Sequence, residues 1–324
     1  MNFSINIKYD FMEKFSLNNL NVWVPGSNGM VASAIIKKFR SENCNIITST
    51  RNDLDLTDKT KVFNFYKLNQ PDVVILAAAK VGGIYANKTF PVDFLLENLC
   101  IQNNVISGAH YFSVKKLLFL GSSCIYPKNI DEPITEDHLL TGSLEETNEW
   151  YATAKISGIK LCQAYQKQYN CDFITAMPTN LYGPNDNFHP LNSHVPAALL
   201  LKFHNAKINN EPFVTVWGTG NPKREFLYVD DLADACIYLL KNYSGTKPIN
   251  VGTGEDISIK NFAEKIKNIV GYKGELNFDK SKPDGTMRKR LNTRRLNNLG
   301  WQYKISLDQG LKLFYEWFIE NANV

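Results

Sequence analysis

The 324-residue chain lacks the features of a metal-bound, disulfide-bonded or membrane-spanning protein. Its six cysteines are scattered without a CxxC pair, which argues against a metal cage or a disulfide framework and favours the cytosol. No stretch approaches the roughly 18 consecutive apolar residues of a membrane span. The net charge of +4 is small and does not argue for a nucleic-acid partner. With 44% hydrophobic and 21% charged residues, the composition is that of an ordinary globular protein.

The first 17 residues lack the uninterrupted apolar segment of a secretory signal peptide. They mix aromatic residues with lysine, aspartate and glutamate. We therefore expect residues 1–17 to form a non-catalytic N-terminal extension.

Apolar, β-rich runs alternate with segments of helical length through the first half of the chain. The runs are residues 21–24, 44–50, 72–79, 115–123 and 171–183. This alternation predicts an α/β fold, a Rossmann-type doubly wound parallel sheet, and near-continuous apolar strands fit a sheet covered on both faces. Composition changes after Tyr182, where a segment rich in Pro and Asn begins. We expect a larger Rossmann-type domain at 18–182 with return segments near 226–257, and a smaller C-terminal domain in most of 183–324.

The second region carries its own structural signals. Residues 212–218 are β-rich, and helices are predicted near Asp230 and from about Ser258. The last helix should open at Ser306, because Gln309 follows at the spacing of a capping box.

A glycine loop connects the first strand to the first helix. Gly26, Gly29 and Ala32 give the pattern GxxGxxA, whose small residues let a helix N-terminus approach a pyrophosphate. Arg51 comes first after the second strand, and its guanidinium suits the 2′-phosphate of NADP. Asp53 and Asp55 lie close enough to keep NAD possible.

The motif YATAK places Tyr151 and Lys155 four residues apart, on one helix face. We expect the lysine charge to lower the pKa of the phenol. Two further YxxxK matches, Tyr111/Lys115 and Tyr243/Lys247, are read as chance, since only Tyr151 follows both the glycine loop and a strand that ends in Gly-Ser-Ser. Either Ser122 or Ser123 could then bind the carbonyl oxygen that Tyr151 protonates.

The glycine loop, the serine after the fourth long strand and the Tyr/Lys pair together resemble the extended short-chain dehydrogenase/reductases. More specific stretches are similar to the GDP-L-fucose synthases: AAAKVGGI (77–84), LFLGSSCIYPK (118–128), MPTNLYGPNDNFHP (177–190), NSHVPAALL (192–200), REFLYVDD (224–231) and SKPDGT (281–286). The resemblance implies a cytoplasmic homodimer that epimerises C3 and C5 of GDP-4-keto-6-deoxy-D-mannose. It then reduces the C4 ketone with NADPH to give GDP-L-fucose.

The same resemblance assigns the chemistry to five residues. Cys124 is expected to be the base and His194 the acid of epimerisation, since a C4 ketone acidifies the hydrogens on C3 and C5. Ser122 and Tyr151 would hold the C4 oxygen, and Lys155 would hold the ribose hydroxyls of the cofactor. No metal is implied.

The remaining expected site residues fall into two sets. The cofactor set is Gly26, Ser27, Asn28, Gly29, Met30, Val31, Arg51, Asp55, Leu56, Ala78, Ala79, Lys155, Pro178, Asn180 and Leu181. The substrate set is Lys80, Ser123, Asn180, Lys202, Trp217, Arg224 and Lys282. Asn28 replaces an arginine that the family often carries, which leaves Arg51 to bind the 2′-phosphate.

Three other functions stay open from the sequence. A GDP-4-keto-6-deoxy-heptose could replace the hexose, since no residue pattern reports the size of the C6 pocket. A reductase without epimerase activity is disfavoured because Cys124 and His194 are both present. A catalytically silent nucleotide-binding scaffold is disfavoured because the Ser/Tyr/Lys set is intact.

Overall fold

The computed structural model describes residues 14–130, 133–189, 193–282 and 284–321. Its largest element is a six-stranded sheet of order β10-β5-β4-β3-β1-β2, in which every neighbouring pair is parallel. The strands are β1 (Asn21–Pro25), β2 (Asn45–Ser49), β3 (Val73–Leu76), β4 (Lys116–Leu120), β5 (Phe173–Pro178) and β10 (Ile249–Val251). The predicted Rossmann-type α/β fold is confirmed.

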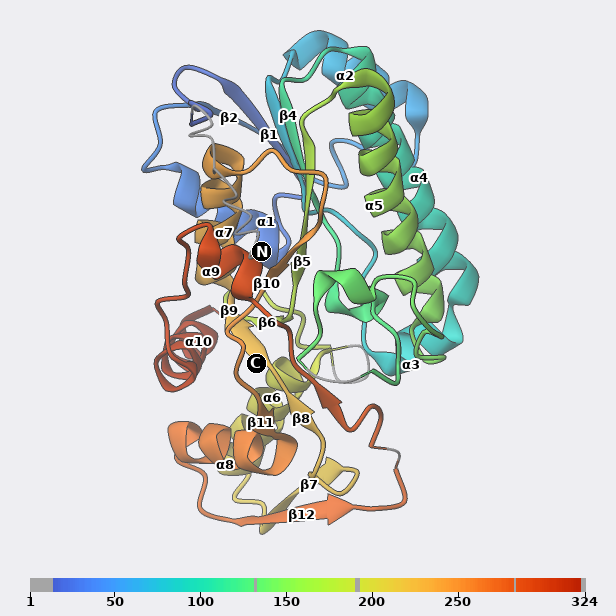
Figure 1. Ribbon diagram of the computed structural model, residues 1–324. Helices are drawn as coiled ribbons and strands as arrows, with labels where there is room; N and C mark the ends of the chain where they lie inside the picture. The colour runs from blue at the N-terminus through green and yellow to red at the C-terminus, as the bar shows by residue number, and fades with distance from the viewer. Residues whose placement is uncertain (1–13, 131–132, 190–192, 283, 322–324) are drawn as a thin grey trace, which may run out of the picture.

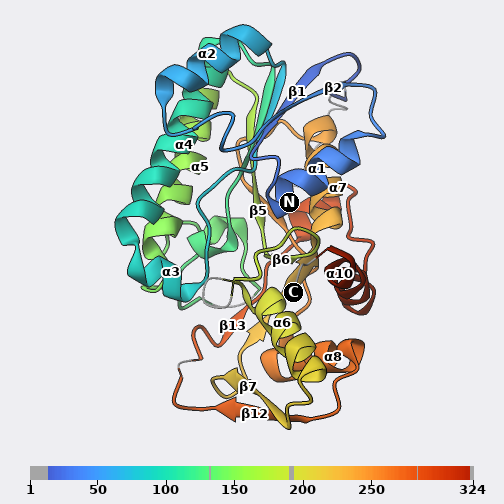
Figure 2. The ribbon, with the colours of Figure 1, turned by 180° about the vertical axis from the view of Figure 1, so that it is seen from behind.

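Helices cover both faces of this sheet (Figures 1 and 2). On one face lie α1 (Met30–Phe39) and α7 (Val229–Asn242), whose apolar side chains share a core with β1, β4 and β5. The other face is covered by α2 (Lys59–Asn69), α4 (Pro91–Tyr111) and α5 (Glu149–Tyr169). Every residue of β3, β4 and β5 is buried, which explains their near-continuous apolar sequences.

A smaller layer lies below the carboxyl end of the sheet (Figure 1). Its helices are α6 (Val195–Ile208), α8 (Ile259–Val270) and α10 (Leu307–Asn321), and its short strands are β6 (Asn180–Tyr182), β7 (Phe213–Trp217), β8 (Lys223–Arg224), β9 (Phe226–Tyr228), β11 (Ile257–Ser258), β12 (Glu275–Asp279) and β13 (Arg288–Lys289). A separate apolar core holds it together, in which Phe226 and Phe262 stack with ring centres 4.1 Å apart. Ser258 and Ser306 accept hydrogen bonds from the amides of Asn261 and Gln309, so α8 and α10 begin where the sequence predicted.

Several segments depart from a simple two-part division of the chain. The β-rich run 171–183 contains two strands: β5 belongs to the large sheet, whereas β6 pairs with β9. The short helix α9 (Arg294–Asn298) and Trp301 pack with the first core although they lie late in the chain. Of the expected extension, residues 1–13 lie outside the described residues, while Leu17 is buried in the first core. The proposed domain boundaries stay a prediction.

The strand order reverses between β1 and β3. The chain runs from β1 to β2 on one side of β1, and then crosses to β3 on the other side. In open α/β sheets, ligands bind at the carboxyl ends of the strands beside such a reversal. Gly26 lies at this point with φ of 77°, and a Cβ atom there would be 3.1 Å from the Cβ of Ala78. The fold therefore places the glycine loop against the segment that follows β3.

Candidate active site

The glycine loop forms one end of the site. Gly29 is the N-cap of α1, and no side chain caps that helix, so its first amides are left to face a ligand. Gly26, Asn28, Gly29, Thr50, Arg51 and Asn52 line an open hollow of about 210 Å³. The predicted cofactor residues Ser27, Met30 and Val31 belong to the same loop and first helical turn. The structure thus brings Arg51, the residue expected to bind the 2′-phosphate, to the same hollow as Asn28 and the glycine loop.

Acidic residues beside this hollow are already engaged in local turns. Asp53 accepts hydrogen bonds from the amide and hydroxyl of Thr50, and these bonds lower the pKa of Asp53. Asp55 accepts equivalent bonds from Thr57, with the same effect on its pKa. Arg51 is 81% exposed at its side chain, with one guanidinium nitrogen 3.6 Å from Glu97. This arrangement favours NADP over NAD, because the guanidinium faces solvent whereas the carboxylates already accept hydrogen bonds from Thr50 and Thr57.

The segment after β3 continues the cofactor crevice. Ala78 meets the glycine loop, and Ala79 follows it in the same extended stretch. The ammonium of Lys80 lies 2.9 Å from Asp93 and 2.6 Å from Glu97 of α4, the glutamate that also lies near Arg51. These two carboxylates raise the pKa of Lys80. The pairing gives this lysine a structural partner, and its expected contact with substrate stays a prediction.

Three catalytic candidates meet at the end of β4. A tight turn, Ser123–Ile125, carries Cys124 next to Ser122, whose Oγ accepts a hydrogen bond from the Cys124 amide at 3.2 Å. Ser122 also forms a hydrogen bond with the hydroxyl of Tyr151, which lies in the first turn of α5. Ser123 is only 3% exposed. Of the two serines that the sequence offered, Ser122 is the one that reaches the tyrosine.

Burial dominates the acid–base behaviour of Tyr151. Desolvation and the nearby Cys124 raise the pKa of Tyr151, and the hydrogen bond from Ser122 only partly opposes them. The expectation that Lys155 lowers this pKa is wrong for the structure, because the lysine Nζ donates to the carbonyl of Leu120 at 2.8 Å and lies 5.8 Å from the Tyr151 ring centre. A phenol with a raised pKa stays protonated at neutral pH. Tyr151 is therefore suited to donate a proton.

The other two YxxxK pairs have no such setting. Tyr111 is 70% exposed at the end of α4. The hydroxyl of Tyr243 donates to the backbone carbonyl of Lys247, whose ammonium lies 3.5 Å from Asp137. Both pairs lie away from the turn that holds Cys124, so spacing alone does not mark a catalytic pair.

His194 is the N-cap residue of α6. Its side chain is exposed, yet the protein atoms around it lower the pKa of the imidazole by desolvation. Of the motif around it, Asn192 lies outside the described residues. Asn180 donates from its side-chain amide to the carbonyl of Glu225 at 2.8 Å and ties β6 to the segment that precedes β9. Pro178 ends β5, and Leu181 packs with the first core.

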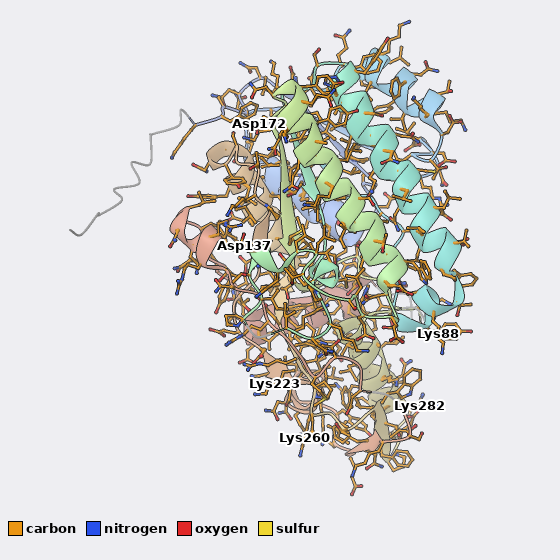
Figure 3. All side chains as sticks on the ribbon, turned by 45° about the vertical axis from the view of Figure 1, so that its right-hand side comes forward. Lys88, Asp137, Asp172, Lys223, Lys260 and Lys282 are labelled. Carbon is orange, nitrogen blue, oxygen red and sulfur yellow. The ribbon has the colours of Figure 1, made fainter. Side chains whose placement is uncertain are left out.

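A cationic cluster lies in the smaller layer. Trp217 is 58% exposed, and the ammonium groups of Lys202 and Lys282 lie 5.7 and 5.6 Å from its ring centre. A side-chain nitrogen of Arg224 lies 3.6 Å from the place where a Cβ on Gly285 would stand. Figure 3 shows Lys282 in this lower layer, far from Asp172 at the opposite end of the sheet. Four of the predicted substrate residues are thus gathered where an aromatic base and an anionic diphosphate could bind together.

One contact was missed by sequence reasoning. The amide Nδ2 of Asn148 lies 3.5 Å from the Sγ of Cys124. Asn148 directly precedes α5, and its only sequence signal was its position three residues before Tyr151. This contact depends on how the start of α5 packs against the turn that carries Cys124, 24 residues earlier in the chain, and a local sequence pattern does not report such packing.

Comparison with known proteins agrees with this geometry. Residues 22–252 match the NAD dependent epimerase/dehydratase family. The chain is 53% identical over 312 residues to GDP-L-fucose synthase 1 of Arabidopsis thaliana, which covers 96% of this chain and 97% of that protein.

Two solved structures have the same fold at lower identity. A GDP-L-fucose synthetase from Naegleria fowleri bound to NADP is 30% identical with a TM-score of 0.89, and covers 95% of this chain and 97% of its own. A GDP-mannoheptose C4 reductase from Campylobacter jejuni with NADP bound is 38% identical with a TM-score of 0.86, and covers 94% of this chain and 99% of its own. The chain therefore belongs to the NAD dependent epimerase/dehydratase family and, within it, to the group of the GDP-L-fucose synthases.

Proposed function

We propose that this chain converts GDP-4-keto-6-deoxy-D-mannose into GDP-L-fucose by epimerising C3 and C5 and reducing the C4 ketone. The observation that carries the proposal is the cysteine beside the Ser122–Tyr151 pair. A reductase needs the serine and tyrosine for the carbonyl, but it has no use for a thiol at that place. An epimerase that works through an enolate needs a base next to the group that holds the enolate oxygen.

NADP(H) is the cofactor of this reaction. The residues fit it, because α1 opens without a side-chain cap, Gly26 allows close approach, and Arg51 faces solvent beside the hollow. Lys155 is assigned to the ribose hydroxyls, and its position beside Tyr151 supports this assignment. The cofactor, when bound, supplies the hydride that reduces C4.

The proton steps fall to the chain's own residues. Cys124 removes the proton from C3 or C5 as a thiolate, while Ser122 and Tyr151 donate hydrogen bonds to the C4 oxygen that becomes an enolate. His194 returns a proton to the opposite face of the same carbon, which inverts it. After both inversions, Tyr151 transfers its phenolic proton to the C4 oxygen as the ketone is reduced. The raised pKa of Tyr151 suits this last step.

The nucleotide end of the substrate is assigned to the cationic cluster. Trp217 offers an exposed ring for the guanine, and Lys202, Lys282 and Arg224 supply positive charge for the diphosphate. Asp284 anchors the segment that carries Lys282 by accepting hydrogen bonds from the amide and hydroxyl of Thr219.

The active form is a cytoplasmic homodimer in this proposal. Helices α4 and α5 lie side by side on one face, where Val92, Leu96 and Trp150 are 67%, 56% and 41% exposed (Figure 2). Apolar side chains at such exposure support burial against a second copy. No described helix is long and apolar enough to cross a membrane.

The deciding experiment is product analysis with NADPH and GDP-4-keto-6-deoxy-D-mannose in D₂O. We expect GDP-L-fucose with one carbon-bound deuterium at C3 and one at C5, and protium from NADPH at C4. The control is Tyr151→Phe, which should reduce turnover by about 10²- to 10⁴-fold because it removes the proton donor.

Two results would contradict the proposal. Reduction without deuterium would remove Cys124 and His194 from their assigned roles and leave a simple reductase. No turnover of the hexose, together with turnover of a GDP-4-keto-heptose, would move the substrate to the heptose class that the Campylobacter relative represents.

A further inference from the structure

Asn148 contacts the proposed base directly. Its amide nitrogen lies 3.5 Å from Cys124 Sγ, a distance at which an N–H donates to sulfur. Asn148 precedes the first turn of α5, but its side chain makes no capping hydrogen bond to that helix. The usual structural reason for an asparagine at a helix N-terminus is therefore missing.

The other end of the same amide is unsatisfied. Asn148 Oδ1 is buried and has no hydrogen-bond partner among the described residues. A buried carbonyl oxygen without a partner costs free energy, so its persistence calls for an explanation in function. A base that cycles between thiolate and thiol offers one, since the thiolate accepts from N–H and the thiol can donate to an amide oxygen after the amide rotates by 180°.

We propose that Asn148 is a positioning residue for epimerisation, whose amide holds Cys124 by donating to the thiolate and accepting from the thiol. This inference rests on the proposed function, in which Cys124 is the base. The atoms balance in each cycle: the thiolate gains the proton from C3 or C5 and becomes a thiol, and His194 loses the proton that it delivers to the opposite face. Solvent then restores both residues, and the amide of Asn148 stays chemically unchanged.

Two substitutions of Asn148 distinguish a role toward the thiolate from a purely structural role. Asn148→Asp keeps the size and shape of the side chain and places a favoured residue at a helix N-terminus, but it removes the donor and adds a negative charge beside the thiolate. Asn148→Ala removes both ends of the amide. A structural role would make the aspartate variant the milder of the two, whereas a role toward the thiolate makes it the more severe.

The experiment measures two activities of each full-length variant. Epimerisation is followed as deuterium exchange at C3 and C5 of GDP-4-keto-6-deoxy-D-mannose in D₂O with NADP⁺, where no net reduction occurs. The hydride step is followed separately as single-turnover oxidation of GDP-L-fucose by NADP⁺, which needs no proton transfer at carbon C3 or C5. Ser157→Ala is the matched control, because it removes a side-chain hydrogen bond to the Thr153 carbonyl on α5.

We expect exchange to fall by about 10- to 100-fold in Asn148→Ala and further in Asn148→Asp, as for a lost hydrogen bond to a charged group. Oxidation of GDP-L-fucose should stay within about twofold of the wild type in both. Any of three results would overturn the inference: wild-type exchange rates in both variants, a milder effect of aspartate than of alanine, or equal loss of both activities. Failure of the wild type itself to exchange deuterium would instead overturn the proposed function, and this inference with it.

Discussion

Among single residues, the site is governed by burial of its titratable groups. Lys155 is 3% exposed, and desolvation lowers its pKa to about 7. The same burial raises the pKa of Tyr151 above its usual range. Burial thus moves both groups toward their neutral forms, so at neutral pH the phenol holds its proton while the ammonium is close to losing one.

The lowered pKa of Lys155 predicts a pH dependence of cofactor binding. Lys155 is charged below about pH 7 and neutral above it, so the affinity for NADP⁺ should fall as the pH rises from 6 to 9. Lys155→Arg keeps its charge throughout this range, because a guanidinium does not deprotonate. Titration of wild type and variant at each pH checks the prediction.

The informative quantity is the dissociation constant of NADP⁺ for the wild type divided by that for Lys155→Arg. Titration of the phosphate of NADP⁺ itself affects both proteins equally and cancels in this ratio. A ratio that does not change between pH 6 and 9 would show that Lys155 holds its charge in the folded enzyme.

Among the elements, β4 has a different role at each end: one end leads to the site, and the other end carries a buried ion pair. Its carboxyl end leads to the turn with Ser122 and Cys124, whereas its first residue, Lys116, is completely buried. The ammonium of Lys116 lies 2.9 Å from Asp172, which directly precedes β5. It also donates to the carbonyl of Tyr243 at 2.6 Å, at the end of α7. One lysine therefore connects two strands and a helix at the end of the sheet opposite the site.

Asp172→Asn should lower the free energy of unfolding by about 2–4 kcal/mol. The substitution leaves the ammonium of Lys116 buried without its counter-charge, and removal of one partner from a buried pair is costly. Urea unfolding followed by fluorescence measures the change.

The control is Glu316→Gln, which breaks the exposed pair of Glu316 with Lys312 and should cost under about 1 kcal/mol. Equal unfolding midpoints for the two variants would show that the buried pair contributes no more than the exposed one.

For the molecule as a whole, Glu225 connects segments that are distant in the sequence. Its side chain is 0% exposed and accepts hydrogen bonds from the amides of Gly254 at 2.9 Å and Leu291 at 2.6 Å. Its backbone carbonyl accepts from Asn180 at 2.8 Å. This residue thus joins the end of the large sheet to the smaller layer that carries the cationic cluster.

Burial raises the pKa of Glu225 to about 7, although the backbone donors oppose the shift. In the unfolded chain the carboxyl has its ordinary pKa of 4.5, so between about pH 4.5 and 7 the unfolded state releases a proton that the folded state keeps. The contribution of Glu225 to stability therefore falls as the pH rises through this window, by up to about 3 kcal/mol.

Glu225→Gln should remove this slope. At pH 5 the variant should be about 2 kcal/mol less stable than the wild type, since an amide NH₂ meets a backbone N–H where a carboxyl oxygen accepted. At pH 8 the difference should narrow or reverse. Urea midpoints at several pH values test the prediction, and a constant difference from pH 5 to 8 would contradict it.

Much of the fold followed from local patterns in the sequence. The segments of helical length between the apolar runs form helices, such as α2 at Lys59–Asn69, and the serines before α8 and α10 accept hydrogen bonds at the expected positions. Alternating apolar runs predicted the parallel sheet because a strand buried on both faces has to be apolar along its length. The split of 171–183 into two strands in two sheets was not predictable, since β6 pairs with β9, more than 40 residues further along.

The sequence by itself determined the family, the order of the elements and the motifs that bring Ser122, Cys124 and Tyr151 into one chain. Only the tertiary structure decided that Ser122 reaches the tyrosine, that Lys155 turns to Leu120, that Lys80 pairs with α4, and that Asn148 meets the thiol. The physical reason is that motifs are local in the chain, whereas desolvation and hydrogen-bond partners are set by residues that come together only after folding.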